Sequence, residues 1–180
     1  MDLGTPAPVA VRRNVEIKAR VADPTALRER VARITDRRAV EIVQDDTFFA
    51  CPSGRLKLRE LSPTRGELIF YQRPDAGGPK VSSYVISKTS EPAALRDLLT
   101  ASLGVTGRVR KQRSLFLAGR TRIHLDDVEG LGHFMELEVV LEDGEPVHAG
   151  EEVARNLMVQ LGIATSDLGG GAYVDLPRAL

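Results

Sequence analysis

The chain has 180 residues, of which 42% are hydrophobic and 28% charged, a composition typical of a single globular domain. Its 25 basic and 25 acidic residues cancel, which argues against general attraction to nucleic acid. No apolar run is long enough to cross a bilayer, and no signal-peptide pattern precedes the domain. The one cysteine, Cys51, excludes an internal disulfide and fits a reducing compartment. We therefore expect a cytoplasmic protein without a membrane or nucleic-acid partner.

Residues 1–12 show no periodicity and are predicted to be a flexible leader, which leaves residues 13–180 as one domain. Alternation of apolar and charged residues, the period of a β-strand, predicts strands at residues 14–21, 55–59, 110–117, 121–126 and 134–140. Two further strands, at 68–73 and 80–87, complete an antiparallel α+β pattern. The polar faces carry Asn14, Glu16, Lys18, Arg20, Lys57, Arg59, Lys111, Arg113, Arg122, His124, Asp126, Glu136 and Glu138.

Three segments instead repeat apolar residues at helical spacing. One follows Asp23, a capping residue that precedes a proline, and another follows the cap Ser90 and stops before Gly104. A third spans about residues 150–161 and ends at a glycine. Their apolar faces are predicted to comprise Leu27, Val31 and Ile34 in the first, Leu95, Leu98 and Leu99 in the second, and Val153, Leu157 and Leu161 in the third.

Two arrangements fit strands with one apolar and one ionic face. In the first, an open sheet carries helices on its apolar side and water on its charged side. In the second, the sheet closes into a barrel whose charged faces line a lumen. The acids and bases stand in i, i+2 pairs, which aims neighbouring side chains at one point and favours the lumen. The pattern alone leaves both arrangements open.

Residues 14–18 (NVEIK) resemble the N-terminal ExExK signature of the CYTH superfamily, named for class IV adenylyl cyclases and thiamine triphosphatases. The first position departs from the signature, because Asn14 stands where the family has glutamate. Further stretches are similar to the family in the same order: 56–60 (LKLRE), 71–74 (YQRP) with 78–80 (GPK), 111–114 (KQRS), 125–132 (LDDVEGLG), 136–138 (ELE) and 173–176 (YVDL). The resemblance implies a closed eight-stranded antiparallel β-barrel, a triphosphate tunnel, with helices packed outside.

The resemblance also implies roles for the charged residues. Bases stabilise the charge of a triphosphate during transfer, and carboxylates among phosphates imply a cation, Mg²⁺ or Mn²⁺, between them. The alternative is that the glutamates only pair with the bases. The implied catalytic residues are Lys111, Arg113 and Asp126, the metal ligands are Glu16, Glu136 and Glu138, and the substrate-binding residues are Lys18, Arg20, Lys57, Arg59, Arg73 and Lys80. His124 is expected only to pack within the barrel.

Three functions fit such a tunnel. The run from Lys111 to Glu138 resembles the cyclase branch, which converts ATP to cyclic AMP and pyrophosphate. The paired bases Lys57 and Arg59 are more similar to the triphosphatase branch, which hydrolyses inorganic, thiamine or nucleoside triphosphate. The third function is a non-catalytic nucleotide- or polyphosphate-binding module, because the amide of Asn14 is a poorer metal ligand than a carboxylate. A small-molecule triphosphate is the expected partner in each case, and the oligomeric state, a dimer included, stays open.

Overall fold

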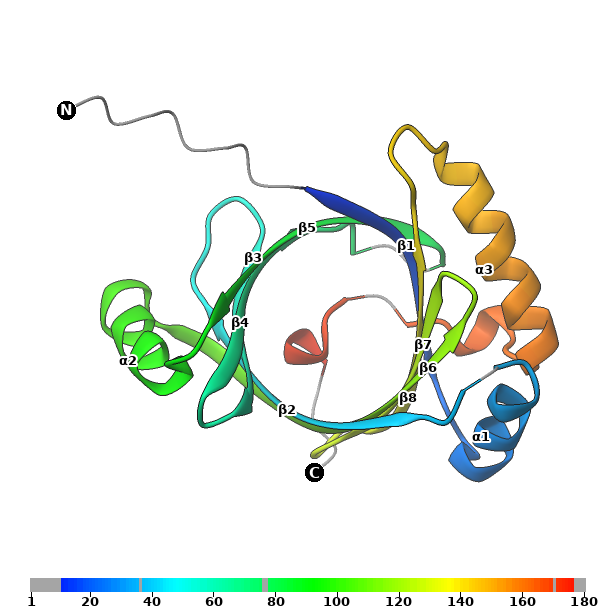
Figure 1. The fold of residues 1–180 in the computed structure, drawn as a ribbon, viewed down its shortest axis with the longest axis horizontal. Helices are drawn as coiled ribbons and strands as arrows, with labels where there is room; N and C mark the ends of the chain where they lie inside the picture. The colour runs from blue at the N-terminus through cyan, green and yellow to red at the C-terminus, as the bar shows by residue number, and fades with distance from the viewer. Residues whose placement is uncertain (1–10, 36, 76–77, 170, 177–180) are drawn as a thin grey trace.

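The computed structural model describes residues 11–35, 37–75, 78–169 and 171–176. Eight antiparallel strands form a closed barrel in the order β1-β5-β4-β3-β2-β6-β7-β8, with the helices outside (Figure 1). This confirms the closed α+β barrel and excludes the open sheet. The strands are β1 (Arg12–Arg20), β2 (Val40–Phe49), β3 (Arg55–Ser62), β4 (Arg65–Gln72), β5 (Lys80–Thr89), β6 (Val105–Ala118), β7 (Thr121–Val128) and β8 (Gly132–Val140).

The barrel wall separates an ionic interior from the main hydrophobic core. In β1, Val15, Ile17 and Ala19 are fully buried and belong to the core cluster that also contains residues of the helices. Glu16 and Lys18, the intervening residues, line the interior instead. Because side chains alternate across a strand, the period-two pattern of the sequence becomes two different environments, one on each side of the wall.

Helices cover the barrel on two opposite sides (Figure 1): α1 (Pro24–Arg33) and α3 (Val147–Leu161) lie on one, and α2 (Pro92–Leu103) lies on the other. As predicted, Asp23 caps α1, and its Oδ1 accepts a hydrogen bond from the amide of Ala26 at 2.9 Å. The third helix begins at Val147, earlier than predicted. It packs closely on the wall at Gly150, where a Cβ would come within 2.8 Å of Val15 Cγ2.

Two predicted details of α2 are wrong. The N-cap is Glu91 and not Ser90, because Pro92 occupies the first helical position and the residue before it is therefore the cap. Leu98 is 62% exposed, whereas Leu99 is buried against the wall. Adjacent residues of a helix point about 100° apart, so only one of these two leucines can face β2, β3 and β4.

No strand is predicted for residues 40–49, where β2 lies. The sequence there does not alternate between apolar and polar residues. Val40 and Val43 lie on opposite faces of the strand, and both are exposed, by 57% and 71%. Asp45 and Asp46 also lie on opposite faces: Asp45 is bonded to arginines outside the barrel, and Asp46 is buried inside. Neither face of β2 is uniformly apolar or polar, so the period-two pattern that marks the other strands is lost.

The C-terminal segment packs against β1 and enters the ring of strands (Figure 1). It first follows β1, where the amide of Gly169 donates to the carbonyl of Lys18 at 2.9 Å. It then places a short 3-10 helix, η2 (Tyr173–Asp175), inside the ring of strands (Figure 1, red). A Cβ at Gly107 of β6 would lie only 2.2 Å from Val174 Cγ2, so a glycine is needed for the segment to pack there.

The remaining expectations concern the leader, the membrane and the cysteine. Residues 1–10 of the predicted leader lie outside the described residues, and Arg12 already belongs to β1. In the part of the chain that the structure describes, no helix has the length and apolar character needed to cross a membrane. Cys51 carries a free thiol in the connection between β2 and β3.

Candidate active site

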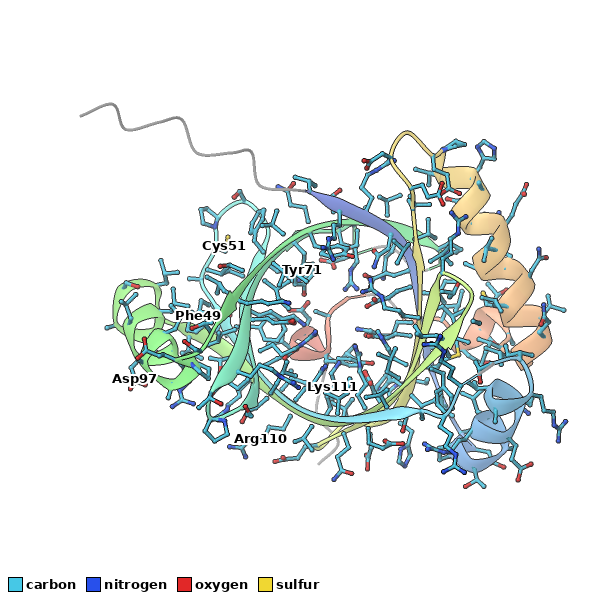
Figure 2. All side chains as sticks on the ribbon, viewed as in Figure 1. Phe49, Cys51, Tyr71, Asp97, Arg110 and Lys111 are labelled. Atoms are coloured by element: carbon cyan, nitrogen blue, oxygen red, sulfur yellow. The ribbon has the colours of Figure 1, made fainter. Side chains whose placement is uncertain are left out.

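Charged side chains from around the barrel converge on a central cavity of about 130 Å³ (Figure 2). Its lining bases are Lys18, Lys57, Arg59, Arg73, Lys111, Arg113 and Arg122, and its lining acids are Glu16, Asp46, Glu136 and Glu138. Bases thus outnumber acids, although the whole chain is neutral. A concave site lined mainly by one sign of charge attracts ligands of the opposite sign. The cavity is therefore suited to a polyanion.

Asp126 of β7 holds the two bases of β6. Arg113 donates from Nε and Nη2 to both of its oxygens at 2.6 Å, and Lys111 Nζ donates at 3.0 Å. The Tyr173 hydroxyl donates a further hydrogen bond at 3.0 Å. Burial alone would raise the pKa of Asp126, but Arg113 and Lys111 lower it to about 2. Asp126 is thus ionised at neutral pH, and its carboxylate is engaged in orienting these bases.

Asp46 of β2 plays the same part for the bases of β3. It accepts hydrogen bonds from Lys57 Nζ at 2.7 Å and from Arg59 Nε at 3.2 Å, and it is 2% exposed. Burial opposes ionisation, but Lys57 and Arg59 hold the pKa of Asp46 well below its usual range. Burial also lowers the pKa of Lys57 to about 8. The sequence did not point to Asp46 because no strand was predicted at β2. The polar i, i+2 pair Gln44 and Asp46 was the one local signal of an inward-facing polar strand face there.

Three glutamates of β1 and β8 lie on one patch of the inner wall. Glu16 pairs in register with Glu138, and Glu136 follows two residues away on the same face. Arg73 donates a hydrogen bond to Glu16, and Arg113 Nη2 donates to Glu136 Oε2 at 2.5 Å. Like charges directly opposite each other in a sheet are destabilising. The group therefore fits a divalent cation that prefers oxygen ligands.

The pKa shifts within this patch show where charge is left uncompensated. Burial raises the pKa of Glu16 although Arg73 lowers it, and Glu136 adds repulsion. For Glu136 itself, burial is outweighed by Lys111 and Arg113, which hold its pKa well below the usual range. Glu136 is therefore ionised at neutral pH. Glu16 would be stabilised in its charged form by a further cation nearby.

Two arginines complete the basic wall. The guanidinium nitrogens Nε and Nη2 of Arg73 are buried and make no hydrogen bond with any described residue. Arg122 of β7 pairs with Glu138 at 2.9 Å and donates to the Tyr84 hydroxyl at 3.1 Å. Buried donors without partners are costly, by roughly 1–3 kcal/mol each. The two nitrogens of Arg73 are thus available to an anion in the cavity.

Inside the barrel, Tyr173 of the C-terminal segment lies against two lysines. Lys18 Nζ lies 3.7 Å from the centre of its ring, and Lys111 Nζ lies 4.8 Å from it. Lys18 also donates to the carbonyl of Gly171 at 3.0 Å and lies 3.6 Å from Glu136. Burial lowers the pKa of Lys18 to about 8. The tail therefore orders bases of the cavity.

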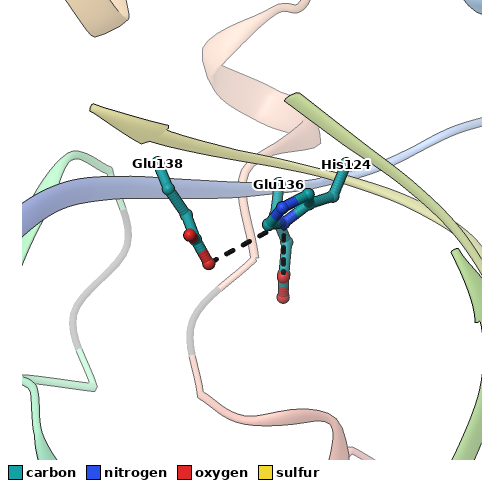
Figure 3. A group of neighbouring side chains, drawn as sticks. All are labelled: His124, Glu136 and Glu138. Carbon is teal, nitrogen blue, oxygen red and sulfur yellow. Dashed lines mark ion pairs between the residues drawn. The ribbon is translucent and has the colours of Figure 1, made fainter. Parts of the chain in front are cut away.

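His124 of β7 was expected only to pack, but it faces the glutamates of β8 (Figure 3). Its Nδ1 lies 3.8 Å from Glu136 and 3.7 Å from Glu138. One ligand atom of each of the three residues lies within 4.8 Å of the others, a grouping that can hold a metal ion. Burial and repulsion by Arg113 lower the pKa of His124, so its ring is neutral at pH 7 and can act as a ligand.

The family model of the CYTH domain matches residues 12–168, which is most of the chain. The chain belongs to the CYTH domain family. A relative named adenylate cyclase CyaB, from Aeromonas hydrophila, is 24% identical to this CYTH chain over 170 residues, which cover 90% of this chain and 87% of the relative.

Solved structures share the barrel. The PH1012 protein from Pyrococcus horikoshii OT3 aligns with a TM-score of 0.81 at 19% identity, over 91% of this chain and 98% of that one. HpAC1 from Hippeastrum, described as an adenylyl cyclase candidate with a dominant triphosphatase activity, aligns with a TM-score of 0.56 at 16% identity, over 88% and 91% of the two chains. These likenesses show that the three proteins share this fold.

Three residues singled out in the sequence, Arg20, Lys80 and Asp126, are not part of the lining of this CYTH cavity. Arg20 is exposed, and its guanidinium lies over the ring of Phe134. Lys80 is buried opposite Glu16 but does not line the cavity, and neither does Asp126. Asn14 does line it, and its buried Oδ1 makes no hydrogen bond within the described residues. The amide oxygen is therefore free to contact a ligand.

Proposed function

We propose that this CYTH protein is a metal-dependent enzyme that acts on a small-molecule triphosphate inside the barrel. The observation that carries the proposal is the excess of buried and half-buried, oriented bases over acids around one cavity. A triphosphate gains charge on its oxygens during transfer, and preorganised cations in a water-poor cavity stabilise that charge. Arg113 and Arg59 offer guanidinium groups suited to phosphate oxygens, and Lys111 and Lys57 act as point charges beside them.

The residues that would hold Mg²⁺ or Mn²⁺ are Glu16, Glu136 and Glu138. Glu16 and Glu138 stand directly opposite each other, which supports a cation between the strands. When bound, the metal would neutralise phosphate charge and position the attacking oxygen. Lys18 and Arg73, next to these acids, would bind the remaining phosphate oxygens.

Cyclisation of ATP is the reaction we favour. The relative named adenylate cyclase CyaB supports it, as does the cyclase-like run from Lys111 to Glu138. In this reaction the ribose 3′-hydroxyl attacks the α-phosphorus and pyrophosphate leaves. Because the carboxylate of Asp126 is already bonded to Arg113, Lys111 and Tyr173, we assign it to positioning these groups and not to taking the hydroxyl proton.

Hydrolysis of a triphosphate is the second candidate. It is supported by the dominant triphosphatase activity described for HpAC1 and by the pair Lys57 and Arg59, held by Asp46. In hydrolysis, water attacks the terminal phosphorus, and the same bases stabilise the departing phosphate chain.

One set of incubations distinguishes these reactions. The full chain is mixed with Mg²⁺ or Mn²⁺ and, separately, with ATP, thiamine triphosphate and inorganic triphosphate, and the products are separated. The cyclase predicts cyclic AMP and pyrophosphate in equal amounts from ATP, with little ADP. Faster release of phosphate from inorganic triphosphate would favour the triphosphatase. Tight ATP binding without any product would leave a binding module, consistent with Asn14 in the metal-binding signature.

A further inference from the structure

Beside the acidic patch lies a buried nitrogen that has no hydrogen-bond partner among the described residues. His124 is 4% exposed and pairs in register with Glu136 across β7 and β8. Its Nδ1 makes no hydrogen bond with any described residue, because the nearest carboxylate oxygens lie 3.7 and 3.8 Å away (Figure 3). A buried polar atom without a hydrogen-bond partner is destabilising, so we expect a bound atom or ion between the ring and the carboxylates.

The spacing matches a shared metal ion. A first-row divalent ion with bonds of about 2.1 Å separates its ligand atoms by roughly 3 to 4 Å. The distances from Nδ1 to Glu136 Oε2 and to Glu138 Oε1 fall in that range. They are too long for a hydrogen bond and too short to leave the groups independent. The three side chains come from adjacent strands of a closed barrel, which holds their backbones in place.

We propose that His124 is a ligand of the metal ion in this barrel and that its nitrogen makes the site prefer Mn²⁺ and other first-row transition metals over Mg²⁺. Imidazole is a ligand of first-row transition metals, including Mn²⁺, which also takes carboxylates, whereas Mg²⁺ binds through carboxylates, phosphates and water. The inference rests on the metal-dependent function proposed above. It adds a ligand, on β7, to Glu136 and Glu138 of β8, and it names the class of metal.

Pulsed electron paramagnetic resonance of bound Mn²⁺ tests the contact directly. The full chain is freed of metal with chelator and loaded with Mn²⁺ in the absence of substrate. A directly bound imidazole gives a ¹⁴N coupling that changes to a ¹⁵N coupling when the protein is labelled with ¹⁵N-histidine. We expect this coupling in the native chain and in His133→Gln, and its loss in His124→Gln. His133 is a suitable control because it lies next to Asp127, half exposed.

Affinity provides a second readout. Mn²⁺ is titrated into the protein, and the free ion is measured by its electron paramagnetic resonance signal. Binding should be roughly 10- to 100-fold weaker in His124→Gln than in the native chain. Mg²⁺, measured by competition, should lose far less affinity in the same variant. His133→Gln should leave both affinities unchanged.

The outcomes separate this inference from the function on which it rests. Mn²⁺ that binds without nitrogen coupling, or with equal affinity in native protein and His124→Gln, would overturn the role of His124. If turnover still needs metal in that case, the proposed function stands. Failure of Mn²⁺ and Mg²⁺ to bind, together with turnover in excess chelator, would overturn both. Should His124→Gln not fold, the spectra of His133→Gln and His148→Gln decide the question: coupling that persists in both belongs to His124, and its loss in either overturns the inference.

Discussion

Each pair of cavity bases on β3 and β6 is held by one buried acid of a neighbouring strand. Asp46 holds Lys57 and Arg59, and Asp126 holds Lys111 and Arg113. Removing one partner of a buried ion pair typically destabilises a protein by about 3–5 kcal/mol, because the other charge is left uncompensated. The acids therefore determine where the bases point before any substrate enters, which is how positive charge is most effective in a cavity.

The metal ligands can be tested with a change that removes charge but little volume. Glu138→Gln should keep the fold and lose nearly all turnover, because an amide carries no charge to hold a cation against Glu16. Turnover and circular dichroism measure the two effects. Glu152→Gln, an exposed position on α3, is the matched control and should behave like the native chain. Full activity in excess chelator, or in Glu138→Gln, would contradict the metal assignment.

Adjacent residues of β6 separate cavity bases from surface bases. Lys111 points into the barrel, whereas Arg110 points outward (Figure 2) and binds Asp45 on the surface. Lys111→Ala should lower kcat/KM by roughly 10²-fold, the scale of one preorganised charge contact. Arg110→Ala should change it little, since exposed ion pairs contribute little. Equal losses in both variants, measured by initial rates, would show that the inner charge has no special role.

At the scale of elements, the C-terminal tail does more than end the chain. It follows β1, enters the barrel and packs Tyr173 against Phe134 in an edge-on contact at 5.0 Å. Phe134, Val109 and Phe48 form a small apolar cluster with Tyr173, apart from the main core. Because this cluster joins three strands to the tail, the position of the tail is coupled to the order of the cavity.

Tyr173→Phe tests that coupling. The change removes the hydroxyl that donates to Asp126 and keeps the ring above Lys18. A hydrogen bond to a charged group contributes about 1.5–3 kcal/mol, so the free energy of unfolding in urea should fall by about that amount. The slope of unfolding against urea should stay the same because the exposed surface is unchanged. Unaltered stability would mean that the tail is not held by Asp126.

For the whole molecule, the barrel keeps ionised groups of both signs in one buried space. Its stability must therefore depend on pH through groups whose pKa differs between the folded and unfolded chain. Asp126 has a pKa of about 2 against an ordinary value of 3.8, so the stability it contributes is lost as the pH falls from about 4 to about 2. Lys57 has a pKa of about 8 against 10.5, so burying its charge costs stability below pH 8. That cost disappears as the pH rises from about 8 to 10.5.

Urea unfolding across pH checks both effects. We expect the unfolding midpoint to fall steeply between pH 4 and pH 2, and to fall less steeply in Asp126→Asn than in the native chain. We expect Lys57 to contribute a rise in stability between about pH 8 and 10.5, which Lys57→Met should remove. If the unfolding midpoint falls between pH 4 and pH 2 by the same amount in Asp126→Asn as in the native chain, the buried ion pairs of Asp126 are contradicted.

Sequence alone determined the strand pattern and most of the charged residues that face the cavity. Alternation in residues 14–21 placed Glu16 and Lys18 on one face, and the pair at 136 and 138 followed the same rule. These inferences succeed because period two is a local property of the extended backbone. Ordered motifs then indicated the family and, through it, the closed barrel.

Only the tertiary structure decided which of these residues meet. β2 has mixed faces, so Asp46 became visible as the partner of Lys57 only when β2 and β3 were paired. His124 and Asp126 share one face of β7, yet the register with β8 turns one toward two glutamates and the register with β6 turns the other toward two bases. Alternation specifies a face, but the partner across it depends on strand order and register. Those depend on how the whole barrel closes, and no local stretch of sequence encodes that.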